Sequence, residues 1–269
     1  MSSFLEKILS AKQAEIEAAR RVLPQAELER LAARRSDFRG LAESLARPGV
    51  RVIAEIKRAS PSLGPIRLDL DPAALATAYQ TGGAAAISVL TEPAFFRGSA
   101  EDLQRARNTV EVPVLRKDFI LEPYQVYETA AMGADAMLII VRILRDEQLE
   151  TLLALARAIG LDVLVEIHDE TDARRIAALA PAVVGINNRN LAHFDTDVNR
   201  AAQLAACLPR GSAAVAASGI REASDIQRSL AAGIRRFLIG ETLVKSPNPA
   251  ELLRQWTALP VPTNLNPEP

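Results

Sequence analysis

The stretch Gly133 to Val165, G-A-D-A-M-L-I-I-V-R-I-L-R-D-E-Q-L-E-T-L-L-A-L-A-R-A-I-G-L-D-V-L-V, contains one complete strand–helix–strand unit. Met137 to Val141 is apolar at every position, which is typical of a strand buried on both faces in a parallel sheet. Asp146 to Ile159 has apolar residues at helical spacing and acidic residues in its first turn. Gly160 suits a helix C-cap, and Val163 to Val165 repeats the pattern of a buried strand.

The same unit recurs along the chain. Short apolar runs, each followed by a turn and a segment of helical period, begin near Val52, Ala85, Val112, Ala136, Val163, Val183, Ala213 and Arg236. Further helical segments are Asp71 to Thr81, Glu170 to Leu179 and Glu222 to Ala232, the first with a capping aspartate and a first-turn proline. Eight such units favour a closed (β/α)8 TIM barrel over an open doubly wound sheet.

The rest of the chain fits one domain. Its 269 residues are 49% hydrophobic, enough for a barrel over residues 1–259. Before Val52 lies an N-terminal helical region, which we expect to cover an end of the barrel because Phe4, Ile8 and Ile16 share one apolar face. Residues 260–269 contain four prolines and little to bury, so we expect a disordered tail.

Composition indicates a small-molecule substrate. The 32 Lys and Arg against 33 Asp and Glu leave a net charge of −1, with no block of one sign typical of a nucleic-acid or membrane partner. One cysteine, Cys207, allows no disulfide within the chain, and Met1 to Arg20 lacks the apolar core of a signal peptide. We therefore expect a cytoplasmic monomer.

Polar residues follow several of the predicted strands, at the barrel end where active sites of this fold lie. Glu55 and Lys57 are two apart, so an acid and an amine point into one cavity. The other polar strand ends contain Lys117, Asp118 and Phe119; Glu166 and His168; Asn187, Asn188 and Arg189; Ser218 and Gly219; and Gly240 and Glu241.

Two groups of these residues predict different chemistry. Glu55, Lys57, Lys117 and Glu166 form an acid and base set whose members should perturb one another's pKa. Backbone N–H groups at Ser218-Gly219 and Gly240-Glu241, from the last two strands, suit a phosphate. The Glu241 carboxylate would repel that phosphate, so we expect only its backbone to take part.

The sequence lacks the patterns of common metal and nucleotide sites. It contains no H-E-x-x-H or cysteine pair, and His168 and His193 are a whole unit apart. Its glycines form neither a dinucleotide fingerprint nor a P-loop. We expect no metal and no cofactor, and a structural hydrogen bond for His168.

Six motifs together resemble the indole-3-glycerol phosphate synthase family. They are I-A-E-I-K-R-A-S-P-S at Ile53 to Ser62, S-V-L-T-E at Ser88 to Glu92, F-F-R-G-S at Phe95 to Ser99, L-R-K-D-F-I at Leu115 to Ile120, P-Y-Q-V-Y-E at Pro123 to Glu128 and G-I-N-N-R-N-L at Gly185 to Leu191. The resemblance implies a carboxy-lyase of tryptophan biosynthesis. Its substrate would be 1-(2-carboxyphenylamino)-1-deoxyribulose 5-phosphate, and its products indole-3-glycerol phosphate, carbon dioxide and water.

The resemblance also implies roles for individual residues. Lys117 would be the general acid, Glu166 the base of the final dehydration, and Lys57, positioned by Glu55, would hold a substrate anion and assist loss of the hydroxyl. The remaining residues would bind the substrate: Asn187, Arg189 and Ser218 orient it, Phe96 and Phe119 flank its aromatic ring, Gly219, Gly240 and Glu241 hold the phosphate, and Ser60 belongs to a mobile first loop.

Two positions depart from the family pattern. Ala217 stands where the family usually has glutamate, and Leu63 where lysine is frequent. Ala217 keeps open the alternative of an impaired or engineered barrel that binds the sugar phosphate without efficient conversion. A phosphoribosylanthranilate isomerase would instead have a catalytic cysteine at the end of the first strand, where this chain has Glu55 and Lys57.

Overall fold

The structure, a computed structural model, describes residues 3–188 and 199–262, and its centre is a closed barrel of eight parallel strands. The strands are β1 (Arg51–Ile56), β4 (Ala86–Leu90), β5 (Val114–Lys117), β6 (Ala136–Ile140), β7 (Asp162–Ile167), β8 (Val183–Asn187), β9 (Ala213–Ala217) and β10 (Arg236–Ile239). Each pairs with its neighbours in the chain, and β1 closes the ring by pairing with both β4 and β10. The predicted (β/α)8 barrel is confirmed.

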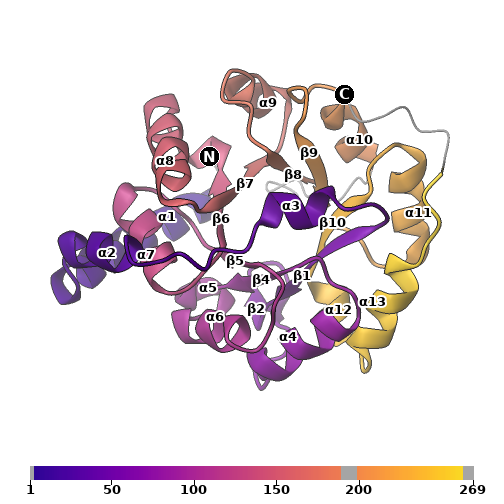
Figure 1. Cartoon of the computed structure of the whole chain (residues 1–269), viewed down its shortest axis with the longest axis horizontal. Helices are drawn as coiled ribbons and strands as arrows, with labels where there is room; N and C mark the ends of the chain where they lie inside the picture. The colour runs from indigo at the N-terminus through magenta and orange to yellow at the C-terminus, as the bar shows by residue number, and fades with distance from the viewer. Residues whose placement is uncertain (1–2, 189–198, 263–269) are drawn as a thin grey trace.

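Helices surround the barrel (Figure 1). They are α4 (Pro72–Thr81), α5 (Pro93–Phe96), α6 (Ala100–Arg107), α7 (Pro123–Ala131), the short 3-10 helix η1 (Val141–Ile143), α8 (Asp146–Ile159), α9 (Glu170–Ile176), α10 (Asn199–Ala205), α11 (Ala223–Ala231), α12 (Glu241–Lys245) and α13 (Pro249–Thr257). None of the helices within residues 3–188 and 199–262 is long and apolar enough to cross a membrane.

The helix termini follow the signals in the sequence. The Asp71 side chain accepts the Ala73 N–H at 3.0 Å, and Gly160 ends α8 in the left-handed conformation with φ 83°. Helix α9 ends at Ile176, three residues before the predicted Leu179. Ala180 precedes a proline, which disfavours helical backbone there, and it has φ 41°.

Alternate residues of each strand point into the barrel. Leu115, Leu138, Leu164 and Leu238 belong to one fully buried interior cluster, whereas the intervening residues pack outward against the helices. Towards the carboxyl ends of the strands the inward positions change from apolar to charged, as at Glu55, Lys117 and Glu166. The apolar interior thus supports a polar site at one end.

The N-terminal region consists of α1 (Ser3–Val22), α2 (Gln25–Ala32) and α3 (Leu41–Ala46). Leu41 and Leu45 of α3 join the interior cluster, and the Ser44 hydroxyl donates to the Ala85 carbonyl at 2.6 Å, just before β4. Figure 1 shows α3 in front of the strands, within the ring of helices. Helix α3 therefore covers the amino ends of the strands, whereas the apolar face from which a cover was expected belongs to α1.

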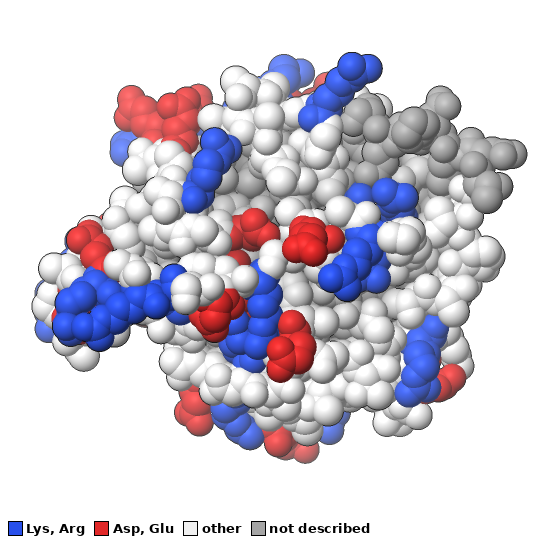
Figure 2. Space-filling model, viewed as in Figure 1, with Lys and Arg blue, Asp and Glu red and all other residues white. Residues whose placement is uncertain are grey.

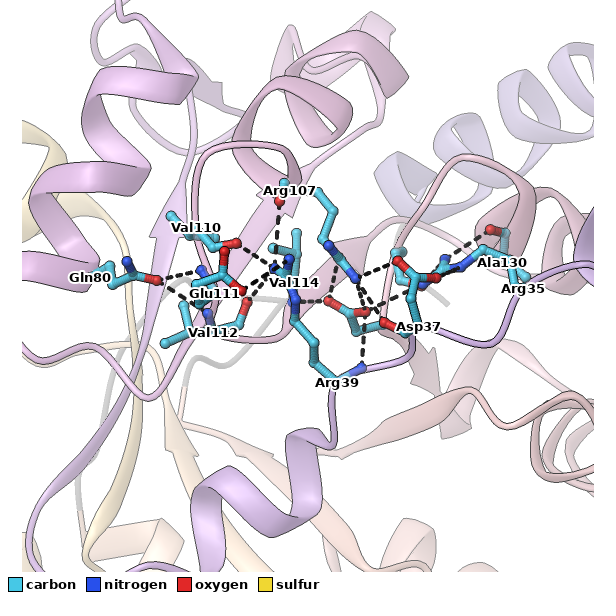
Figure 3. A network of polar contacts seen from close by, with 12 residues as sticks. Arg35, Asp37, Arg39, Gln80, Arg107, Val110, Glu111, Val112, Val114 and Ala130 are labelled. Carbon is cyan, nitrogen blue, oxygen red and sulfur yellow. Dashed lines mark hydrogen bonds and ion pairs between the residues drawn. The ribbon is translucent and has the colours of Figure 1, made fainter.

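A buried ionic network attaches the connection between α2 and α3 to the barrel (Figure 3). Asp135, whose side chain has no exposed surface, pairs with Arg107 at 2.9 Å and Arg35 at 3.4 Å. Its carboxylate also accepts the backbone N–H groups of Arg39 and Val114. These contacts satisfy one buried carboxylate from three segments of chain and hold the N-terminal region in place.

The first βα connection forms a small hairpin. β2 (Ala59–Ser60) pairs antiparallel with β3 (Gly64–Pro65), and Ser60 is buried. The Arg58 guanidinium binds Asp102 at 2.8 Å and donates to the Leu68 carbonyl at 2.7 Å. The Arg58 side chain therefore links the start and the end of the loop to α6, and the mobility of the loop stays a prediction.

Candidate active site

A pocket opens at the carboxyl ends of the strands and contains every predicted site residue that the structure describes. Its lining includes Glu55, Lys57, Ser60, Phe96, Lys117, Phe119, Glu166, Asn187, Ser218, Gly219, Gly240 and Glu241. Arg189 lies outside the described residues. In this fold active sites lie at the carboxyl ends of the strands, and here those ends bring together residues up to 186 positions apart in the chain, from Glu55 to Glu241.

An ion pair between Lys117 of β5 and Glu166 of β7 spans the pocket. Lys117 Nζ lies 3.3 Å from Glu166 Oε2, and the Asn187 amide donates to Glu166 Oε1 at 3.1 Å. His168 Nε2 lies 3.4 Å from the same Oε1 oxygen. Each oxygen of Glu166 thus faces a different set of polar groups.

The charges of this pair stabilise each other. Burial opposes the charge of Lys117, but the carboxylates of Glu166 and Glu55 outweigh burial and raise the pKa of the amine above its ordinary value. Burial likewise opposes the charge of Glu166, and Lys117, His168 and Asn187 outweigh it and lower the pKa of the carboxyl. An ammonium and a carboxylate therefore lie side by side in the pocket, one able to donate a proton and the other able to accept one.

His168 lies between two carboxylates at the edge of the pocket. Its backbone N–H donates to Asp172 at 2.9 Å, and its buried ring lies between Asp172 and Glu166 and lines the pocket. The ring nitrogens lie 3.4 Å from Glu166 and 3.7 Å from Asp172 of α9.

A second acid–amine pair lies at the end of β1. Lys57 Nζ contacts Glu55 Oε1 at 2.6 Å, which confirms that the two side chains share one cavity. Gly240 of the last strand end passes directly beside them: a Cβ there would collide with Glu55 Oε1 and lie 3.1 Å from the Glu55 Cβ. Only glycine leaves room for the Glu55 carboxylate in this position.

Another side of the pocket, next to Glu55, is formed by backbone. Ser218 has φ 72° and Gly219 φ 85°, so the chain turns sharply where it leaves β9. Gly240 and Glu241 begin α12 beside this turn, and the Glu241 carboxylate pairs with Lys245 at 2.7 Å. The carboxylate is thereby occupied within its own helix, and the backbone of both turns remains for an anionic ligand.

Aromatic and aliphatic side chains cover the third side. The ring centroids of Phe96 and Phe119 lie 6.2 Å apart with the ring planes tilted by 45°, so the two rings contact each other and form one apolar surface. Phe4, Leu5 and Ile8 of α1 also line the pocket, and Phe4 contacts Phe95 edge-on at 5.4 Å.

The contribution of α1 was missed at the sequence level. An apolar helix face indicates burial but not the surface that it covers, so Phe4 and Ile8 gave no sign of a place at the pocket. Arg142 was also missed, although it directly follows the apolar run of β6; it lines the pocket and pairs with Asp169 at 2.8 Å.

Of the two residues that depart from the family pattern, Ala217 lies in the pocket and Leu63 lies outside its lining. Ala217 lines the pocket, is almost fully buried, and lies beside Asn187 and Leu238 in the sheet. Its methyl group therefore leaves space where a longer side chain would reach the ligand. Leu63 lies in the hairpin loop with about half of its surface exposed, and it is not part of the pocket lining.

Over nearly its whole length, the chain is similar to proteins that all have the same name. Residues 5–256 match the family model of indole-3-glycerol phosphate synthase. A protein of that name from Desulfosudis oleivorans is 50% identical over 95% of this chain and 98% of its own. One from Syntrophobacter fumaroxidans is 46% identical over 94% and 97%, and one from Bordetella pertussis is 43% identical over 96% and 100%.

Solved structures with little sequence similarity share the fold. 3-Hexulose-6-phosphate synthase from Salmonella typhimurium aligns with a TM-score of 0.62 at 12% identity, over 77% of this chain and 96% of that one. Thiamine phosphate pyrophosphorylase from Pyrococcus furiosus aligns with a TM-score of 0.59 at 14% identity, over 81% and 96%. These likenesses concern the barrel alone, whereas the family match includes the pocket residues: the chain belongs to the indole-3-glycerol phosphate synthase family.

Proposed function

We propose that the protein closes the indole ring of indole-3-glycerol phosphate from 1-(2-carboxyphenylamino)-1-deoxyribulose 5-phosphate, with loss of carbon dioxide and water. The observation that carries the assignment of roles is the Lys117–Glu166 pair, an ammonium and a carboxylate 3.3 Å apart in the pocket. Membership of the family supports the reaction itself.

In the first step the aromatic carbon that bears the carboxylate attacks the ribulose carbonyl carbon. Lys117 gives a proton to the carbonyl oxygen as negative charge develops there. Its raised pKa keeps the amine protonated before the step, and the apolar walls Phe96 and Phe119 hold the ring against the carbonyl. The carbon–carbon bond forms and the carbonyl becomes a hydroxyl.

The second step releases carbon dioxide, and the electrons of the broken bond restore the aromatic ring. The third removes the new hydroxyl as water and a proton from the neighbouring carbon. Glu166 accepts that proton, and Lys57, held by Glu55 at 2.6 Å, assists departure of the hydroxyl. Lys117 thus acts in ring closure, and Glu166 and Lys57 act in dehydration.

Substrate binding uses the remaining sides of the pocket. Asn187, Ser218 and Arg189 orient the sugar, while the backbone N–H groups of Gly219, Gly240 and Glu241 hold the phosphate. The Ser218–Gly219 turn and the start of α12 support this placement because both line the pocket with backbone. Ser60, on the hairpin, closes the site from the first loop.

Substitution of Lys117 tests the central role. We expect Lys117→Met to lower kcat about a hundredfold or more, with a much smaller change in KM, because only the proton donor is lost. The measurement is steady-state formation of the fluorescent indole product. Lys7→Met, an exposed lysine on α1, is the control. An unchanged kcat in Lys117→Met would show the assignment wrong.

A second candidate function rests on Ala217. The chain could bind the sugar phosphate without efficient conversion, because a methyl group occupies a buried pocket position where the family usually has a carboxylate. The same assay separates the two: turnover near background in the unmodified protein, with a large gain in Ala217→Glu, would favour the binding barrel.

We further propose that the protein acts as a monomer in the cytoplasm, without a nucleic-acid or membrane partner. Acidic and basic side chains lie interspersed over the face shown in Figure 2, in keeping with the net charge of −1. Within the described part of the chain, the large hydrophobic residues that are strongly exposed are Val22, Leu63 and Leu68, which do not form one sequence segment.

A further inference from the structure

We propose that Lys12 of α1 is a positioning residue for the Lys117 ammonium, acting through a buried ion pair with Asp118. The inference rests on the role of Lys117 in the proposed function. It adds a helix that is distant from Lys117 in the sequence to the parts of the molecule that determine turnover.

The ion pair joins two side chains that are almost completely shielded from water. Lys12 Nζ lies 2.7 Å from Asp118 Oδ1; the side chains are 1% and 0% exposed. Lys12 also contacts the half-buried Glu15 at 2.8 Å. Charges are rarely buried this deeply without a specific partner, because loss of hydration is costly unless a close ion pair compensates it.

Asp118 is the residue that follows Lys117, and polar contacts surround its carboxylate. Thr91 Oγ1 donates to Oδ2 at 2.6 Å, Arg116 pairs with Oδ2 at 3.1 Å, and the Phe119 N–H donates to Oδ1 at 2.8 Å. Fixing Asp118 therefore fixes the backbone between Lys117 and Phe119, which line the pocket on either side of it.

Lys12 supplies a charge that Arg116 alone cannot. Arg116 is shared between Asp118 and Glu128, which it contacts at 2.8 Å. Burial opposes the Asp118 charge, but Arg116 and Lys12 outweigh it and lower the pKa of this carboxyl. Without Lys12, two carboxylates would compete for one guanidinium, and the contacts that hold Asp118 would rearrange.

The position of Lys12 on α1 also sets the register of that helix. Lys12 lies one turn after Ile8 and one turn before Ile16, on the buried face. Apolar contacts tolerate sliding, whereas an ion pair of 2.7 Å does not. Phe4 and Ile8, which reach the pocket from this face, are consequently held in one place relative to Lys117.

The experiment compares Lys12→Met, which keeps an unbranched side chain one atom shorter and removes its charge, with Lys7→Met on the exposed face of the same helix. Both are assayed at a temperature at which circular dichroism shows them folded. We expect kcat of Lys12→Met to fall about tenfold with KM changed less than threefold, since displacement of a catalytic group by a fraction of an ångström is sufficient for this loss. Lys7→Met should match the unmodified protein.

Asp118→Asn provides a second, independent variant. It should reproduce the loss in kcat, and the double variant should lose no more than the worse single one, because both substitutions break the same pair. Additive losses, or an unchanged kcat in folded Lys12→Met, would overturn the inference. If Lys12→Met does not fold, an unchanged kcat in Asp118→Asn overturns it equally.

A measurement on Lys117 itself separates this inference from the proposed function. In protein with 15N-labelled lysine, the NMR signal of Lys117 Nζ, assigned by its absence in Lys117→Met, should shift in Lys12→Met and not in Lys7→Met. An unshifted signal contradicts the positioning role, whether or not the protein turns over substrate. Full kcat in Lys117→Met would instead contradict the proposed general acid while leaving the NMR result to decide on Lys12.

Discussion

Gly240 lies where any side chain would collide with the Glu55 carboxylate. Its φ of −121° is negative, so the requirement for glycine comes from Glu55 and not from a left-handed turn. The sequence predicted a role for Gly240 in binding phosphate through its backbone. The structure adds a second reason for glycine, the close approach of the Glu55 side chain.

Substitution of this glycine should therefore act through Glu55. We expect Gly240→Ala to lower kcat/KM at least tenfold, because the methyl group displaces Glu55 from Lys57 and a shift of this size costs one to two orders of magnitude. The assay is indole formation under steady-state conditions. In a Glu55→Ala background, which removes the collision, the same substitution should cost little; an equal loss in both backgrounds would contradict this account.

The Lys117–Glu166 pair predicts a particular pH dependence. In the unmodified protein burial opposes both charges, but the pair outweighs it: the pKa of Glu166 is lowered, that of Lys117 is raised, and both groups are charged at neutral pH. Glu166→Gln removes the main group that raises the Lys117 pKa, and burial then lowers it.

We therefore expect the alkaline limb of the residual kcat/KM of Glu166→Gln to move down by about one pH unit or more. The exposed Glu170→Gln serves as the matched control, and its profile should follow the unmodified protein. An alkaline limb that stays in place in Glu166→Gln would show that Glu166 does not govern the charge of Lys117.

At the scale of elements, strands and most helices could be predicted because their signals are local. The helix Asp146–Ile159 was predicted at both ends, since acidic residues begin it and Gly160 ends it. The carboxyl ends of the strands then located the site residues through the geometry of the barrel.

Elements whose position depends on distant contacts could not be predicted in the same way. The hairpin of β2 and β3 depends on Arg58 and its contact with Asp102, 44 residues away. The pocket role of α1 depends on Lys12 and Asp118, 106 residues apart. A lysine between Ile8 and Ile16 on an apolar face was the one available signal, because it required a buried partner.

The ionic network around Asp135 should stabilise the attachment of the N-terminal region. We expect Asp135→Asn to lower the free energy of unfolding by about 3 kcal/mol, because it leaves Arg35 and Arg107 without their fully buried anion. Asp37→Asn, which removes a carboxylate that is 64% exposed in the same network, should cost about 1 kcal/mol or less.

Urea unfolding followed by the fluorescence of Trp256, the one tryptophan of the chain, measures both values. The kcat of folded Asp135→Asn should be unchanged, because the network lies at the amino ends of the strands (Figure 3). If Asp135→Asn and Asp37→Asn lowered the free energy of unfolding equally, burial of the Asp135 carboxylate would not explain its contribution to stability.

At the scale of the whole molecule, the contacts that stabilise the fold and the residues of the pocket lie at opposite ends of the barrel. Its amino end is closed by α3 and the Asp135 network, and its carboxyl end has the charged pocket covered by α1. The eight strands connect the two ends through one apolar interior, so the pocket can hold opposed charges close together on a rigid support.

The most direct test of the account is conversion of 1-(2-carboxyphenylamino)-1-deoxyribulose 5-phosphate by the purified protein, without added metal and in the presence of a chelator. The account predicts growth of indole fluorescence with one carbon dioxide released per indole formed, and loss of both in Lys117→Met. Fluorescence no greater than that of Lys117→Met would contradict it.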